Sequence, residues 1–491
     1  MRKLCDRLVT KADNYNNLKF NMILNAIRGI TKIIFPLISF PYASKVLGVE
    51  ALGQYNYANS IISYIILIAG LGISTYAIRE GSQLRDDKAK LEDFACQMFT
   101  INIFSTVFAY IILLFIVANV RQLTEYSILI WLLSIQVGLG TIGVEWIYSI
   151  YENYLYITIR SILFQFFSII ALFIFVHTPN DLISYTLISV FASAGANILN
   201  YTFSRRYVTI SLKKEIQWKQ HLKPIFILFG MAVTITIYVS SDITMLGAIC
   251  GDYHVGIYSV STKLYSIIKT ILASVLVVSI PRLSAIAGKD NKEEFESVAS
   301  DILNTLITLL MPTVFGMIIL RREIVLIISD ETYISATSSL SILAIALFFC
   351  MLAWFWGQCV LIPLGRETHV FRATVLSAIV NVVLNIIFIP QFQENAAAAT
   401  TVLAQAIAFI YCFWIATKEV SLRKTAGIFI KALLGCLGMV IFSAILYPLH
   451  KNTILFTVVT IVCDVFVYLL LECILKNKVV LDAILFLHKK T

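Results

Sequence analysis

FNMILNAIRGITKIIFPLISFP (residues 20–41) is an apolar run long enough to cross a bilayer, and it carries Arg28 and Lys32 near its middle. A cation inside a membrane is costly unless it faces a partner or a water-filled cavity. Asn25 lies on the same predicted helical face, because residues three and four apart are neighbours on a helix. An anionic substrate in an aqueous cavity would compensate both charges. The alternative is that both side chains reach the membrane surface.

Apolar runs of this kind recur along the whole chain, whose residues are 59% hydrophobic and only 14% charged. Soluble domains are roughly one-quarter charged. The pattern predicts about fourteen membrane-spanning helices, near residues 20–41, 57–79, 94–118, 125–150, 157–177, 181–203, 224–248, 254–281, 298–320, 336–364, 370–390, 395–417, 427–447 and 453–475. The connections are short, so the predicted fold class is an all-α membrane protein.

Basic residues concentrate in alternate connections, for example Arg79, Arg85 and Lys88 after the second span. Cytoplasmic connections carry the excess of lysine and arginine. Both termini are therefore predicted to lie in the cytoplasm of a multi-pass protein. The net charge of +9 is then a sign of topology and not of nucleic-acid binding.

A weak repeat links the second and eighth spans, which begin at Gly53–Tyr55 and Gly256–Tyr258. The repeat would be six spans long, an even number, so the halves would run the same way across the membrane. Chance similarity is the alternative. The repeat predicts two pseudo-equivalent six-helix lobes plus two C-terminal helices, with bounds 1–203 for the first lobe, 204–223 for a cytoplasmic linker, 224–417 for the second lobe, 427–475 for the last two spans and 476–491 for a cytoplasmic tail.

The eighth predicted span contains two further cations, Lys263 and Lys269. At about 100° per residue the two lie about 120° apart around a helix, so both can border one wide cavity. Lys263 alternatively reaches toward the outer surface.

Acids and amides inside the spans are further candidates for function. Asp242 and Glu145 could bind a coupling cation or relay a proton. Asp242 could equally pair with an embedded lysine, and Glu145 could be interfacial. Asn381 and Asn385 are possible sugar contacts, although amides in membrane helices more often join helices to one another.

Enzyme motifs are absent from the sequence, which has no phosphate-binding loop and no hydrolase or metalloprotease signature. The nine cysteines are scattered singly, so no metal site, cofactor or disulfide framework is predicted. These features favour a secondary transporter over an enzyme.

The region around residues 20–95 resembles the N-terminal signature of Wzx-type polysaccharide flippases of the multidrug/oligosaccharidyl-lipid/polysaccharide exporter superfamily. The matching stretches are PYASKVLG (41–48), LGQYNYANS (52–60), GLG (70–72) and YAIRE (76–80). Over the rest of the chain the resemblance depends on the number of spans and their organisation.

This resemblance implies translocation of an undecaprenyl-diphosphate-linked oligosaccharide from the cytoplasmic to the outer leaflet of the bacterial inner membrane, for O-antigen, capsule or exopolysaccharide assembly. It implies ion-coupled alternating access, with H+ or Na+ as the coupling cation, and possible polymerase and chain-length partners. The family's basic cavity residues would correspond to Arg28, Lys32, Lys263 and Lys269, by their positions on polar helix faces.

Three other functions compete with this one. A drug exporter of the same superfamily would favour acids over bases in its cavity, and a lipid II flippase would differ from the signature at residues 41–48. A membrane glycosyltransferase or polymerase would need longer outer connections.

Overall fold

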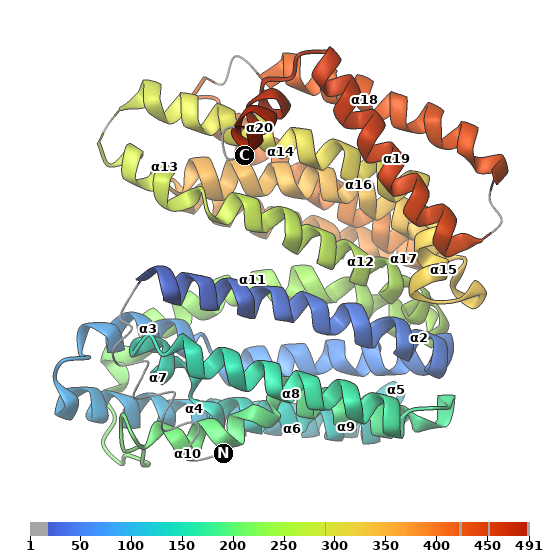
Figure 1. Cartoon of the computed structure of the whole chain (residues 1–491). Coiled ribbons are helices and arrows are strands. Elements are labelled where there is room, and N and C mark those ends of the chain that lie inside the picture. Colours follow the sequence, from blue (N-terminus) through green and yellow to red (C-terminus); the bar gives the residue numbers. More distant parts are fainter. Residues whose placement is uncertain (1–17, 290, 422–424, 450–451, 489–491) are drawn as a thin grey trace. The chain divides into compact units, whose positions relative to one another are not determined.

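The computed structural model describes residues 18–289, 291–421, 425–449 and 452–488, without the side chains of residues 18–28, 30–33, 238, 449, 483 and 486–488. All regular structure in these ranges is helical. The chain divides into two compact units, residues 1–248 and 249–491 (Figure 1). The predicted fold class, an all-α membrane protein, is confirmed.

The first unit holds the helices that precede residue 249. They are α2 (Leu18–Gly70), α3 (Ile73–Gln83), α4 (Lys88–Asn119), α5 (Arg121–Thr124), α6 (Ser127–Gly143), α7 (Glu145–Ile150), α8 (Tyr154–Phe175), η1 (Pro179–Asp181), α9 (Leu182–Val190), η2 (Phe191–Gly195), α10 (Ala196–Ser204) and α11 (Trp218–Cys250). The long helix α2 packs against α4, α6 and α8. Helix α6 also contacts α9 and α10.

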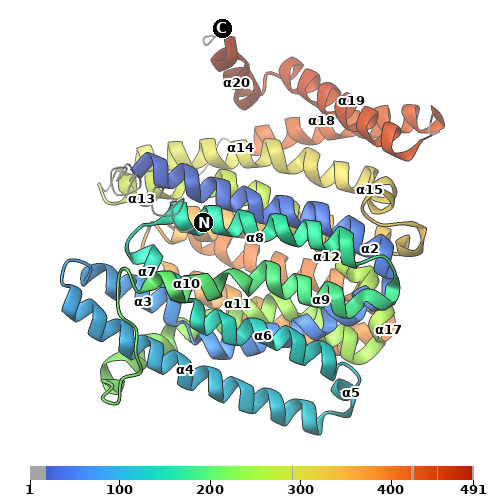
Figure 2. The same cartoon turned by 60° about the horizontal axis from the view of Figure 1, so that its bottom comes forward.

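The second unit begins with α12. Its helices are α12 (Asp252–Val277), α13 (Ile280–Ala287), α14 (Lys292–Ile319), α15 (Arg321–Ile328), η3 (Glu331–Tyr333), α16 (Ala336–Trp354), η4 (Phe355–Leu361), α17 (Glu367–Ala416), α18 (Thr425–Leu446), η5 (Tyr447–Leu449), α19 (Thr453–Ile474) and α20 (Lys478–His488). Helix α16 packs between α12 and α17, and α14 joins α16 to α18. Figure 2 shows α18 and α19 as a pair beside α14.

Eleven helices in the described residues are long and apolar enough to span a membrane. Two of the helices, α2 and α17, are each interrupted by one residue with a non-helical backbone, Gly48 and Gln393. Each interruption lies between two predicted spans. Helix α17 covers one pair of them, whereas α2 covers the first span and the beginning of the second, which continues in α3. The predicted fourth span is represented by the shorter apolar helix Ser127–Gly143.

The break in α2 depends on a glycine. Gly48 has φ 76° and ψ 178°, a region of backbone space that is open to glycine and strained for other residues. The helix resumes at once after Gly48, so residues 42–56, which the spans left out, are helical as well.

Large apolar side chains on the outside of the helices indicate contact with lipid. On α4 the exposed Phe104, Phe108, Ile111 and Phe115 follow each other at spacings of four, three and four residues. Such a stripe would be unfavourable in water, whereas lipid solvates it. The protein is therefore a multi-pass membrane protein.

The predicted linker 204–223 packs onto the first unit. Val208 and Ile210 are buried in a core with Phe94 and Trp146, and Lys213 forms an ion pair with Asp93. Helix α11 follows the linker, and its residues up to Ala248 belong to the same unit. Whether 1–203 and 224–417 act as equivalent lobes stays a prediction.

Candidate functional site

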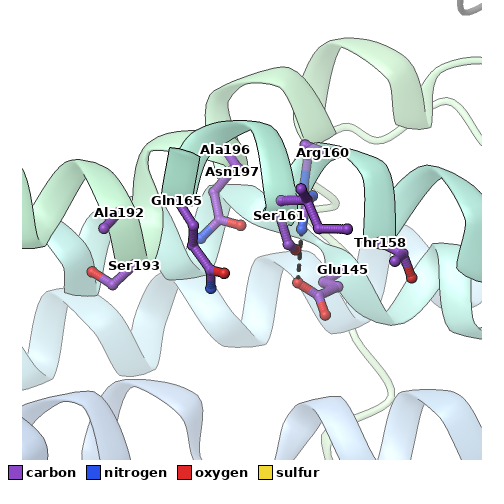
Figure 3. Close-up of a pocket in the computed structure, with 10 residues that line it drawn as sticks. Glu145, Thr158, Arg160, Ser161, Gln165, Ala192, Ser193, Ala196 and Asn197 are labelled. Atoms are coloured by element: carbon purple, nitrogen blue, oxygen red, sulfur yellow. Dashed lines mark hydrogen bonds and ion pairs between the residues drawn. The ribbon is translucent and has the colours of Figure 1, made fainter. Parts of the chain in front are cut away.

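A polar cavity of about 410 Å³ lies inside the first unit, among α7, α8, η2 and α10 (Figure 3). Its lining carries charged, amide and hydroxyl groups on helices that are otherwise strongly apolar. The polar side chains of the lining include those of Glu145, Arg160, Ser161, Gln165, Ser193 and Asn197.

Arg160 is the most buried charged residue of this cavity, with only 6% of its surface exposed. It lies in the second turn of α8, inside a membrane-spanning helix. Its guanidinium donates to Glu145 Oε2 at 3.2 Å and to the side-chain oxygen of Asn200, and it lies 5.8 Å from the ring centroid of Tyr156. The cation is therefore compensated within the protein by a carboxylate, an amide and an aromatic ring.

The backbone at the end of α6 places Glu145 opposite Arg160. Val144 has φ 37°, which ends α6 and starts the short helix α7 at Glu145 in a new direction. The carboxylate is partly exposed, with 37% of its side-chain surface accessible, and points toward Arg160 in Figure 3. A coupling cation at Glu145 would have to compete with the Arg160 guanidinium for the carboxylate. The coupling role of Glu145 stays a prediction.

The far wall of the cavity comes from a π-helix. Residues Phe191–Gly195 form η2, which places Ser193 beside the cavity. The hydroxyl of Ser193 lies 3.4 Å from Gln136 Oε1, and Asn197 Oδ1 accepts from Asn200 Nδ2 at 3.2 Å. Single π turns inside α-helices occur frequently at functional sites.

Two of the four predicted cavity cations have described side chains. Lys263 and Lys269 both lie well inside α12, about 17 Å and 26 Å along the axis from its first residue at 1.5 Å per residue. The Lys269 ammonium lies 5.8 Å from the ring centroid of Tyr265. The other predicted residues, Asn25, Arg28 and Lys32, lie on α2, but their side chains are outside the described part of the structure.

Asp242 is buried in α11, with 7% of its surface exposed. The carboxylate of Asp242 interacts electrostatically with Tyr64 of α2. Two residues after Asp242, the Thr244 hydroxyl donates to Ser60 Oγ of α2 at 2.9 Å. The carboxylate thus lies near the Tyr64 hydroxyl group of α2, within the first unit. Both roles predicted for Asp242, cation coupling and charge pairing, stay predictions.

Asn381 and Asn385 are fully buried within α17. Asn385 Nδ2 donates to Asn381 Oδ1 at 3.3 Å, and Thr400 donates to Asn385 Oδ1 from the other side of the break at Gln393. These contacts join the two halves of α17. Joining helices to one another is the alternative to sugar contact that the sequence indicates for these amides. Contact with sugar stays a prediction for this pair.

The sequence reasoning did not select Arg160 as a site residue. The available signal was an arginine inside an otherwise apolar span, the same signal that selected Arg28. Its acidic partner precedes the span and reaches it only through the turn at Val144. Among the described residues, no group of three histidine, cysteine or acidic side chains could hold a metal ion.

Solved structures show what this fold resembles. The lipid II flippase MurJ in an inward closed conformation superposes with a TM-score of 0.77 at 16% identity, covering 94% of this chain and all (100%) of that one. An inward-facing multidrug resistance transporter of the MATE family gives a TM-score of 0.61 at 13% identity, covering 83% and 99%. At these identities the likeness establishes the fold alone.

The curated relatives are described as O-antigen transporters or as a glycan biosynthesis flippase. A protein of Escherichia coli (strain K12) described as an O-antigen transporter is 23% identical over 55% of this chain and 66% of its own length. A Shigella dysenteriae protein with the same description is 22% identical over 74% of this chain and 91% of its own. A Haloferax volcanii protein described as a low-salt glycan biosynthesis flippase is 27% identical over 34% and 35%. The chain thus spans about two thirds of the first relative and about a third of the last.

Two family models match the chain. The MatE model matches residues 227–387. The model described as polysaccharide biosynthesis protein matches residues 18–287, which is more than half of the chain. The chain therefore belongs to the polysaccharide biosynthesis protein family, whose resemblance was visible in the stretch 41–80.

Proposed function

We propose that this protein is a flippase that moves undecaprenyl-diphosphate-linked oligosaccharide units from the cytoplasmic to the outer leaflet of the bacterial inner membrane. The units would serve the assembly of a surface polysaccharide such as O-antigen or capsule. Membership of the polysaccharide biosynthesis family and relatives described as O-antigen transporters support this proposal.

The observation that carries the proposal is the pair of lysines inside α12. Lys263 and Lys269 lie in a helix apolar enough to span the membrane, where a cation is expensive unless it serves a polar path. A diphosphate supplies the complementary charge, and charge-assisted bonds to phosphate oxygens are strong. The prenyl tail can stay in lipid, so only the head group needs a polar route.

Charge also distinguishes this function from drug export, the main alternative. The MATE fold is shared with multidrug transporters, but cationic drugs would favour acids over bases along the path. The cations of α12, with Arg28 and Lys32 in the first span, favour an anionic substrate.

Loss of the gene tests this function directly. Cells lacking the protein should contain the complete lipid-linked repeat unit, confined to the cytoplasmic leaflet, and should lack the surface polysaccharide. Impermeant glycan oxidation of intact spheroplasts, followed by lipid extraction and mass spectrometry, reports the leaflet. Export of single repeat units would instead indicate a polymerase, and normal polysaccharide would contradict the proposal.

Asp242 is the candidate for coupling transport to an H+ or Na+ gradient. If its buried carboxylate takes up the coupling cation, Asp242→Asn should remove gradient-driven transport and leave the protein's abundance unchanged. If it pairs with a cation, the same change should lower abundance, and neutralising the partner should restore it. Substrate flux with an imposed gradient in vesicles, together with immunoblots, separates these results. Wild-type flux at normal abundance would exclude both roles.

A further inference from the structure

We propose that the cavity of the first unit binds one or more sugar rings of the transported head group, while the diphosphate is held elsewhere. This inference rests on the proposed function and assigns to Arg160, Gln165 and their neighbours the recognition of neutral hydroxyl groups.

The charge of the cavity fits a neutral ligand. Arg160 and Glu145 form an ion pair at 3.2 Å, so the two charges cancel close to the cavity. A diphosphate would be repelled by the carboxylate, and a metal or sodium ion would be repelled by the guanidinium. A sugar hydroxyl can bond to either group without disturbing the pair.

Unsatisfied polar atoms also point to a ligand. Among the described residues, the buried atoms Arg160 Nε and Gln165 Oε1 have no hydrogen-bond partner. One is a donor and the other an acceptor, and leaving such buried groups unpaired is unfavourable. A sugar hydroxyl donates and accepts at once, so a polyol matches this combination once the two side chains, whose unpaired atoms are closed to solvent in this conformation, turn toward the cavity.

The position of the cavity beside the membrane-spanning helix α8 limits which kinds of ligand can occupy it. Ser161 and Gln165 line the cavity, four residues apart on α8, while Leu163, Phe166 and Phe167 are exposed as lipid-facing side chains would be. Polar side chains in spans face the bundle interior or water and not hydrocarbon. The occupant is therefore hydrophilic, and an acyl or prenyl chain does not fit this site.

Size and backbone geometry are consistent with a binding site. The volume of about 410 Å³ falls in the range of about 300–1,000 Å³ that is typical of small-molecule pockets. The π-helix η2 adds one residue to a turn and so sets the direction of Ser193 and Asn197, which line the cavity together with Arg160 (Figure 3).

Binding to two soluble probes tests the proposal on the purified full-length protein in detergent. One probe is the oligosaccharide released from the cell's own lipid-linked pool by mild acid, and the other is sugar-free farnesyl diphosphate. Gln165→Leu should weaken oligosaccharide binding roughly tenfold, the loss expected for one or two hydrogen bonds. The same variant should bind farnesyl diphosphate like the wild type.

A matched pair of serines on α8 controls for effects on the helix. Ser161 and Ser168 both donate to the carbonyl four residues earlier, at 2.8 Å, but only Ser161 lines the cavity. Ser161→Ala should weaken oligosaccharide binding several-fold, and Ser168→Ala should leave it unchanged. This pair also decides the question if Gln165→Leu does not fold.

Each remaining outcome has one meaning. Wild-type oligosaccharide binding in both Gln165→Leu and Ser161→Ala would overturn the sugar site and leave the flippase function in place. Equal loss of both probes would overturn its restriction to sugar. A wild-type protein that binds neither probe would contradict the proposed function together with the site.

Discussion

Replacing Lys269 with alanine is expected to lower the rate of head-group translocation by roughly 10- to 100-fold, because a hydrogen bond to a charged group contributes about 1.5–3 kcal/mol. Lys269 lies deep in α12, and its ammonium contacts only the face of Tyr265 among the interactions of the described residues. Lys269→Arg should recover part of the rate, since the charge survives while its geometry changes. Flux of lipid-linked substrate in reconstituted vesicles measures the effect.

Lys418→Ala is the matched control for this variant. The Lys418 ammonium also lies over an aromatic ring, 3.5 Å from the centroid of Trp414, but the residue is exposed and follows the end of α17. The control should transport at the wild-type rate. If Lys269→Ala transports normally at normal abundance, the diphosphate is held elsewhere and the cationic cavity assignment is wrong.

The second large effect concerns the Glu145–Arg160 pair, whose two members should respond unequally. Glu145→Gln leaves the nearly buried Arg160 without its carboxylate, and a buried group that loses its partner in this way costs about 1–3 kcal/mol. Arg160→Gln leaves a carboxylate that is 37% exposed and can be partly solvated, so its cost should be smaller. Unfolding temperatures in detergent, with protein abundance in membranes, report both.

Arg85 and Glu152 provide the comparison, because their ion pair has the same length of 3.2 Å but lies exposed. Glu152→Gln should change stability by less than about 1 kcal/mol. The double variant Glu145→Gln with Arg160→Gln should be more stable than Glu145→Gln alone. Equal melting temperatures for Glu145→Gln and Glu152→Gln would show that burial does not govern this pair.

Much of the fold followed from the sequence because hydrophobic runs of about 20 residues have few alternatives to a spanning helix. The connections were harder to predict. Gly48 and Gln393 look like loop residues between spans, but each interrupts a helix that continues on both sides. The segment near Val208 has the basic, mildly apolar composition of a linker, and its contribution to a buried core depends on contacts with distant residues.

The candidate site was less accessible to sequence reasoning for a related reason. A cation in a span is visible in the sequence, as Lys269 and Arg160 both are. Its partner is not, because the contact between Glu145 and Arg160 depends on one left-handed residue, Val144, that redirects the chain. The same holds for Asn385, whose bond to Thr400 crosses the break in α17.

The π-helix η2 has a consequence for comparing related chains. A π turn contains one residue more than an α turn, so η2 acts as a one-residue insertion within the sixth span. Side chains before and after such an insertion differ in phase by about 100° from an uninterrupted helix. A gap-free alignment to a relative without this extra residue would therefore equate Ser193 or Asn197 with a lipid-facing position. Relatives that share the cavity should carry the same extra residue, and those that lack it should have lost this wall.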